Sequence, residues 1–253
     1  MIVESAPPKI TNNKYRELYL SWRNARLKNL EAYKQQIDAD VELLQIHGHN
    51  KILDVGCAFG FTLMELSRMG FDCHGIEITP EFADIARSVS DHFNLKANIT
   101  NGDACHLPYR DCTFDAVMST EFFSHVSEPE QTLNEQIRVL KKGGRLLIRD
   151  GNILCPVILY DLLFAWTLRT RGRYGGLKWV TTRQKVIHNY DNRGFDGKAE
   201  DVKSLYWWRR ILSAHKEIEV EIATTGFAYR HNRIPKAFAP FLGNIIIVAR
   251  RIA

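Results

Sequence analysis

Short apolar segments alternate with longer amphipathic segments between residues 51 and 149, and this alternation restricts the fold more than any other feature. The short segments are predicted strands and comprise residues 51–56, 73–78, 97–100, 114–120 and 145–149. The segments with helical spacing of apolar side chains comprise residues 61–69, 81–93 and 129–140. Strands that alternate with helices form parallel βαβ units, because a parallel strand is reached only through a crossover connection. With right-handed crossovers, the chain is expected to form a doubly wound, Rossmann-like α/β sheet.

Four sections of the chain are expected from these patterns. Residues 1–47 are predicted to form a helical lid, because apolar side chains recur there every three to five residues. Residues 48–152 are the predicted ligand-binding core, and residues 153–215 are expected to form a helical and basic insertion that binds the second substrate. Residues 216–253 contain an alternating segment and a continuous apolar segment, typical of two antiparallel edge strands of the same sheet.

Residue types refine the prediction for two of the helices. The helix at 129–140 is expected to end in a glycine cap at Gly143-Gly144, after two lysines. Trp207 and Trp208 are adjacent in a later predicted helix, so they cannot share one face. One of them is expected in the core, and the other is a candidate for the wall of a substrate pocket.

Charge and cysteine content exclude several classes of protein. The formal net charge is +5, with 17 Lys and Arg against 21 Asp and Glu in residues 1–150, and 17 against 8 in residues 151–253. The five cysteines are scattered without a CxxC pair, so neither a disulfide framework nor a thiolate metal site is expected. His47 and His49 lack a third ligand at metal spacing, so no metal is predicted. The start of the chain does not resemble a secretory signal, and a reducing, cytoplasmic location is expected.

An apolar segment at residues 153–168 and a basic segment at residues 169–185 stand out after the core. The apolar segment has 16 residues, whereas a membrane span needs about 20, so a buried or interface-seeking helix is predicted. The basic segment is either a solvated loop or an attractor of an anionic partner, such as a metabolite or a lipid surface in peripheral membrane contact. No nucleic acid is expected, because aromatic residues are not interleaved in a stacking pattern.

Three predicted strands end in residues that suit a nucleotide-like ligand. The first is followed by the loop at residues 54–60, whose glycines permit close backbone approach and whose end opens onto a helix N-terminus. A plain tight turn is the alternative. Glu77 ends the second strand and can accept hydrogen bonds from ribose hydroxyls. Asp103 follows the third strand and can accept from an exocyclic amine, or it bonds its own backbone in a turn.

Four segments in order (DVGCAFG, HGIEI, GDACHLPYRDCTFDAV and LKKGGRLLI) resemble the class I S-adenosylmethionine-dependent methyltransferases, over about residues 48–152. The nearest likeness is to the small-molecule branch that includes the quinone C-methylases. The resemblance implies a seven-stranded, mostly parallel sheet with an antiparallel last strand, and S-adenosyl-L-methionine as cofactor. It implies contacts from Asp54, Gly56, Cys57, Ala58 and Gly60 to the methionine part, from Glu77 and Ile78 to ribose and adenine, from Asp103 and Ala104 to the adenine edge, and from Ser119 near the methyl-bearing sulfur. The family loop often has glycine at Ala58, so a positive φ there would cost about 1 kcal/mol or more.

Methyl transfer is an in-line displacement that depends mainly on positioning, and it needs a base only when the acceptor arrives protonated. Glu121 and His125 follow the fourth strand and are the candidate catalytic residues, with a packed or capping role as the alternative for His125. The sequence therefore predicts transfer of a methyl group to a small anionic acceptor, either a metabolite, a sugar or a lipid-linked molecule. Two alternatives remain: a non-catalytic cofactor-binding or scaffold protein, and an NAD-dependent oxidoreductase, which the missing GxGxxG disfavours. The oligomeric state is left open.

Overall fold

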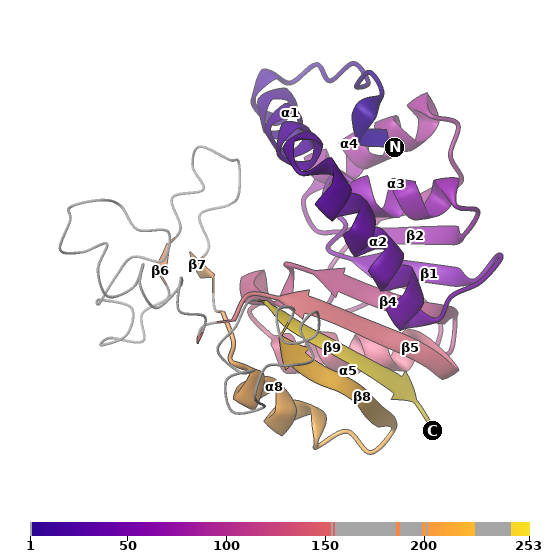
Figure 1. The fold of residues 1–253 in the computed structure, drawn as a ribbon, viewed down its shortest axis with the longest axis vertical. Helices are drawn as coiled ribbons and strands as arrows, with labels where there is room; N and C mark the ends of the chain where they lie inside the picture. The colour runs from indigo at the N-terminus through magenta and orange to yellow at the C-terminus, as the bar shows by residue number, and fades with distance from the viewer. Residues whose placement is uncertain (1, 153, 155–185, 188–198, 201, 226–243) are drawn as a thin grey trace.

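A seven-stranded sheet forms the centre of the molecule in this computed structural model, which describes residues 2–152, 154, 186–187, 199–200, 202–225 and 244–253 (Figure 1). The strands are β1 (Lys51–Val55), β2 (Asp72–Glu77), β3 (Ala97–Asn101), β4 (Phe114–Thr120), β5 (Leu140–Asp150), β8 (Ile218–Thr225) and β9 (Ile245–Arg251). A separate pair, β6 (Val186–Ile187) and β7 (Ala199–Glu200), forms a two-stranded antiparallel sheet. The segments 155–168 and 169–185 lie outside the described residues, so their predicted structure stays a prediction.

The strand order is β3-β2-β1-β4-β5-β9-β8. Strands β1 to β5 pair in parallel, whereas β9 is antiparallel to both β5 and β8. The predicted seven-stranded, mostly parallel sheet with an antiparallel last strand is thereby confirmed. The order reverses between β1 and β4, and ligands of such sheets bind beyond the carboxyl ends of the strands at this switch point.

Helices cover both faces of the sheet. They are α1 (Asn13–Lys28), α2 (Leu30–Leu44), α3 (Phe61–Arg68), α4 (Pro80–His92), α5 (Pro129–Val139) and α8 (Leu205–Leu212), with short 3-10 helices η1 (Ile2–Glu4) and η2 (Phe123–His125). One buried cluster joins α2, α3 and α4 to residues such as Ile52, and the other joins α5 and α8 to residues such as Leu53. Adjacent residues of β1 therefore point into different cores, as strand alternation requires.

The section at residues 1–47 that was predicted to be helical contains two α-helices, which meet at Asn29. Aromatic side chains attach the first of them to the loop after β1, because the ring of Phe59 lies 5.6 Å from Tyr19 and 5.1 Å from Trp22. Phe59 also lies 4.5 Å from Phe82 of α4. Helix α1 is thus packed on the same loop that the sequence predicts to be a ligand site.

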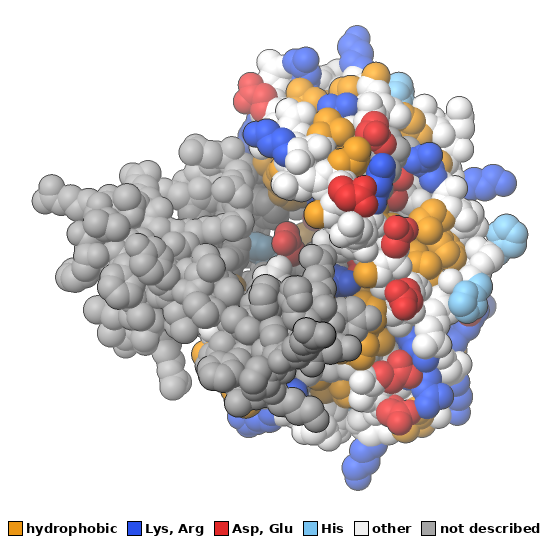
Figure 2. Space-filling view, viewed as in Figure 1, with side chains coloured by type: hydrophobic (Ala, Val, Ile, Leu, Met, Phe, Trp, Pro, Cys, Tyr) orange, Lys and Arg blue, Asp and Glu red, His pale blue; other side chains and the backbone are white. Residues whose placement is uncertain are grey.

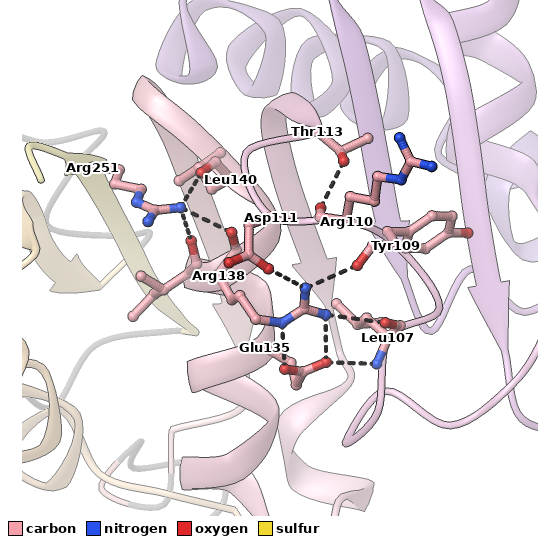
Figure 3. Close-up of polar contacts among 10 residues, drawn as sticks. Leu107, Tyr109, Arg110, Asp111, Thr113, Glu135, Arg138, Leu140 and Arg251 are labelled. Atoms are coloured by element: carbon pink, nitrogen blue, oxygen red, sulfur yellow. Dashed lines mark hydrogen bonds and ion pairs between the residues drawn. The ribbon is translucent and has the colours of Figure 1, made fainter.

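The predicted glycine cap of α5 is wrong, because the helix ends at Val139 and β5 begins directly at Leu140. Arg251 of β9 donates from Nη1 to the carbonyls of Ile137 and Arg138, each at 2.9 Å, and also to Leu140 (Figure 3). A side chain from the last strand thus supplies donors for carbonyls at the end of the helix. Gly143 instead adopts a φ of +80° inside β5.

The late predicted helix is α8, and its Leu205, Trp208 and Leu212 are buried. Trp208 packs edge-on against Phe123 at 4.8 Å, whereas Trp207 is half-buried. The expectation that one of the two tryptophans lies in the core is confirmed. On the surface, Figure 2 shows acidic and basic side chains interspersed over the described residues of one face, with small hydrophobic areas between them. No helix among the described residues is long and apolar enough to cross a membrane.

Candidate cofactor site and active site

The loop after β1 has three residues in the left-handed region of backbone space. Gly56, Ala58 and Gly60 have φ values of 76°, 47° and 74°. A Cβ atom on Gly56 would lie 2.2 Å from the ring of Phe122, so this position requires glycine on two grounds. The positive φ at Ala58 carries the strain that an L side chain brings to this conformation.

Glu77 lies at the end of β2 with only 7% of its surface exposed. Its Oε2 accepts a hydrogen bond from the Ala58 N–H at 3.0 Å, and its Oε1 accepts one from the Thr79 N–H at 2.8 Å. Burial raises the pKa of Glu77, and these two bonds oppose the increase. A carboxylate has about four acceptor positions, so Glu77 is oriented by the backbone and keeps capacity for a ligand.

Asp103 is exposed and begins the loop after β3. Its Oδ1 accepts from the Cys105 N–H at 2.8 Å, and this bond lowers its pKa. The turn geometry considered from the sequence is therefore present, while Oδ2 lies 3.7 Å from the ring of His106. The Gly102 N–H donates to the Glu77 carbonyl at 3.0 Å, which holds the ends of β2 and β3 together.

Arg138 of α5 hydrogen-bonds to residues further along the same loop (Figure 3). Its guanidinium donates to the carbonyls of Leu107 and Tyr109 at 3.0 and 2.8 Å, and pairs with Glu135 at 2.6 Å and Asp111 at 2.6 Å. The loop that begins at Asp103 is thus anchored to a helix of the core.

Asp54 at the end of β1 is 6% exposed, and burial raises its pKa to about 7, with further contributions from the charges of Glu77 and Asp40. Asp40 comes from α2 and is 1% exposed. Burial raises the pKa of Asp40 to about 6, although the ion pair with Arg149 of β5 opposes this. The sequence reasoning missed Asp40 and Arg149, because neither belongs to a motif. An acid on the apolar face of a helix was the one available signal.

Ser119 is fully buried, and its hydroxyl lies 3.5 Å from Gln136 Oε1 of α5. Its side chain therefore faces α5. Thr120 follows it and points to the opposite face, which carries Asp54. Ser119 is the second-to-last residue of β4, so its backbone lies near the carboxyl end of the strand.

The turn after β4 carries both candidate catalytic residues. Glu121 is exposed with a φ of 52°, and its N–H donates to the Arg149 carbonyl at 2.8 Å. His125 ends η2 and is half-buried. Asp150 fixes this turn by accepting from the Ser124 N–H at 2.9 Å, and burial raises the pKa of Asp150 to about 7. Sequence reasoning missed Asp150, whose role depends on a contact across 26 residues.

Comparisons with known proteins agree with this geometry. Residues 53–148 match the family described as a methyltransferase domain. Norajmaline N-methyltransferase from Rauvolfia serpentina is 36% identical over 100 residues, which cover 38% of this chain and 34% of that protein. Demethylmenaquinone methyltransferase from Tropheryma whipplei (strain Twist) is 35% identical over 111 residues, which cover 44% of this chain and 45% of that protein. The chain thus spans less than half the length of either relative.

The fold also matches solved structures. YcgJ from Bacillus subtilis aligns with a TM-score of 0.59 and 16% identity, over 87% of this chain and 99% of that chain. At this identity the likeness concerns the fold. Together, the strand order, the site and the family match define a class I S-adenosylmethionine-dependent methyltransferase domain in this chain. The resemblance of the four motifs is thereby confirmed, and the cofactor of the domain is S-adenosyl-L-methionine.

The residues present suit this cofactor, which carries a sulfonium and an ammonium cation. Asp54 is a buried carboxyl whose ionisation is disfavoured by burial and by two neighbouring acids, so a bound cation would stabilise its charged form. Glu77 offers acceptor capacity beside the loop after β1. The charge of Asp54 and the acceptor capacity of Glu77 therefore agree with the cofactor that the family uses.

Proposed function

We propose that this chain transfers the methyl group of S-adenosylmethionine to a small anionic acceptor. The observation that carries the proposal is the hydrogen bond between the Ala58 N–H and Glu77, which joins the glycine loop and the strand-end carboxylate at the switch point of the sheet. Buried Asp54 lies on β1, which pairs with β2 on one side and with β4 on the other. This combination supports a pocket for an adenosyl ligand, and the missing GxGxxG pattern disfavours a dinucleotide.

Each candidate residue has a proposed role. Glu77 would accept from the ribose hydroxyls. Asp103 and Ala104 would meet the adenine edge, beside Ile78, which is a 62% exposed apolar side chain at the end of β2. The methionine part would lie against the loop, and the contacts proposed there come from Asp54, Gly56, Cys57, Ala58 and Gly60, with the backbone of Ser119 nearby.

When bound, the cofactor supplies an electrophilic methyl group. The chain's own contribution is to hold the acceptor in line with that group and to keep water out. Glu121 and His125 stand on the turn after β4, where a protonated acceptor could lose its proton to one of them. The bond from the Ser124 N–H to Asp150 supports this assignment, because it holds the turn rigidly against β5.

An anionic acceptor is proposed from charge. Residues 151–253 carry 17 Lys and Arg against 8 Asp and Glu, and a net positive charge favours negatively charged ligands. We assign residues 1–47 to a lid, 48–152 to the cofactor-binding core, 153–215 to the acceptor-binding section and 216–253 to the edge of the sheet. The packing of Trp22 on Phe59 supports a lid over the loop.

Calorimetry with S-adenosylmethionine and its product S-adenosylhomocysteine tests the cofactor, and transfer of a labelled methyl group to acceptors from a metabolite extract tests the reaction. We expect binding and transfer in the wild-type chain, and loss of both in Glu77→Ala. Absence of binding would overturn the proposal. The alternative, a cofactor-binding or scaffold protein without catalysis, is favoured by the strained Ala58 and predicts binding without transfer to any acceptor.

A further inference from the structure

Four polar residues form a row along the carboxyl edge of the sheet. Register pairs Asp54 with Gly75 and Met118, and pairs Thr120 with Arg149. Since side chains two residues apart share a face, Glu77, Thr120 and Arg149 lie on one face, at one level, on β2, β4 and β5. Asp54 lies on the same face of β1, one pleat lower. Neighbouring strands are about 4.8 Å apart, so this row extends from Glu77, the proposed acceptor for the ribose hydroxyls, across the strands beside the glycine loop.

Helix α2, which belongs to the proposed lid, packs over the end of this row. It contacts β5, and Figure 1 shows it lying across the face of the sheet. Asp40 of α2 reaches Arg149, whose Nε and Nη2 both lie 2.5 Å from Oδ1 of Asp40. Both contacts use one carboxylate oxygen, so the second oxygen is left for another partner.

One acceptor in this row and one on α2 are buried and unpaired. Oδ2 of Asp40 and Oγ1 of Thr120 have no hydrogen-bond partner among the described residues. The Asp40 side chain is 2% exposed. Asp40 pairs with Arg149, and Thr120 lies beside Arg149 in the register of β4 and β5. Buried polar atoms are nearly always hydrogen-bonded, so two unpaired acceptors next to the same guanidinium suggest that a ligand supplies the missing donors.

We propose that Asp40, Thr120 and Arg149 receive the amino-acid end of the cofactor. Oδ2 of Asp40 and Oγ1 of Thr120 accept hydrogen bonds from the α-ammonium, and the guanidinium of Arg149 donates to the α-carboxylate. This inference rests on the proposed function and deepens it, because it adds three residues outside the glycine loop and makes the lid helix part of the binding site.

Charge supports this assignment. The site holds three carboxylates (Asp40, Asp54 and Glu77) and one guanidinium, whereas the cofactor holds two cations and one carboxylate. The net charge of these site residues is thus opposite in sign to the net charge of the cofactor. Arg149 has five N–H donors, of which two atoms engage Asp40, so donors remain for a second carboxylate.

The competing explanation is an ion pair that only fastens α2 to the sheet. Such a pair would contribute to stability and would not distinguish one adenosyl ligand from another. The two explanations therefore differ in ligand selectivity, which can be measured without any turnover.

The experiment compares two ligands by calorimetry, S-adenosylhomocysteine and 5′-methylthioadenosine, which lacks the amino-acid end. We expect Asp40→Asn and Thr120→Val each to weaken S-adenosylhomocysteine at least tenfold and to leave 5′-methylthioadenosine within twofold of wild type. Asp38→Asn removes the same charge from an exposed site on the same helix and should change neither affinity. Thermal unfolding of each variant reports whether it is folded, and Thr120→Val keeps the β-branched shape if Asp40→Asn does not fold.

Equal weakening of both ligands, or no weakening of either, would overturn the inference and leave the proposed function standing. Failure of the wild-type chain to bind either ligand would instead overturn the proposed function, and the inference with it.

Discussion

The N–H of Ala58 donates a hydrogen bond to Oε2 of Glu77 at 3.0 Å, across 19 residues of sequence. This bond joins the loop after β1 to the carboxyl end of β2. Because Thr79 holds the other oxygen of Glu77, the carboxylate has a fixed orientation before any ligand arrives. The glycine loop and the strand-end acid thus act as one preorganised unit.

Replacing Glu77 by Gln tests the role of this carboxylate. The amide has one oxygen where two are needed, so one backbone donor loses its acceptor and a ribose hydroxyl loses a charged partner. A hydrogen bond to a charged group is worth about 1.5–3 kcal/mol, so S-adenosylhomocysteine should bind roughly 10- to 100-fold more weakly by calorimetry. Asp91→Asn, at an exposed position of α4, is the matched control and should leave the affinity unchanged. Unaltered binding in Glu77→Gln would remove Glu77 from the site.

Replacing Ala58 by Gly should stabilise the protein by up to about 1 kcal/mol, because glycine adopts a φ of 47° without steric strain. Urea unfolding measures the change. The same substitution at exposed Ala32 within α2 should destabilise by about 1 kcal/mol, since glycine is unfavourable inside a helix. The prediction fails if both substitutions lower the free energy of unfolding.

The buried carboxyls should make stability fall as the pH rises from about 5 to 7. Burial raises the pKa of Asp54 to about 7, so the folded chain holds a proton that the unfolded chain has already released in this range. Unfolding then releases a proton, and higher pH favours it by at most about 1.4 kcal/mol per pH unit for each such group. Asp40 and Asp150, with pKa values raised to about 6 and about 7, act in the same direction.

Denaturant unfolding at several pH values tests this dependence. Asp54→Asn should flatten the slope between pH 5 and 7 without abolishing it, because Asp40 and Asp150 still titrate. Asp103 has a lowered pKa and is ionised in both states throughout this window, so Asp103→Asn should leave the slope as it is. An unchanged slope in Asp54→Asn would show that this carboxyl titrates normally.

Replacing Arg138 by Met should lower the free energy of unfolding by about 2 kcal/mol. The substitution keeps much of the apolar stem but removes the donors to Leu107 and Tyr109, and it leaves Glu135 without its cation. Thermal or urea unfolding measures the loss. Arg110→Met, which removes an exposed arginine from the same loop, should change stability by less than about 0.5 kcal/mol. Similar losses in both variants would contradict a specific role for Arg138.

Local patterns in the sequence were sufficient to predict most of the sheet. The strand at 114–120 matches β4 at both ends. The predictions for β1 and β3 differ by one residue at one end, and the prediction for β2 differs by one residue at both ends. The prediction succeeds for β1 and β4 because buried parallel strands are mostly apolar and are bounded by turn residues, whereas β3 is an edge strand with polar residues. The end of α5 was predicted wrongly, because its capping donors come from Arg251, more than 100 residues away.

The sequence by itself determined the order of strands and helices, the glycine loop and the strand-end acids Glu77 and Asp103, because periodicity and backbone freedom are properties of short segments. Only the tertiary structure decided that Ser119 faces α5 while Thr120 lies on the same face of the sheet as Asp54, and that Asp40 pairs with Arg149 across 109 residues. Such pairings depend on strand register and helix packing, which bring distant residues together and leave no mark on the segments that supply them.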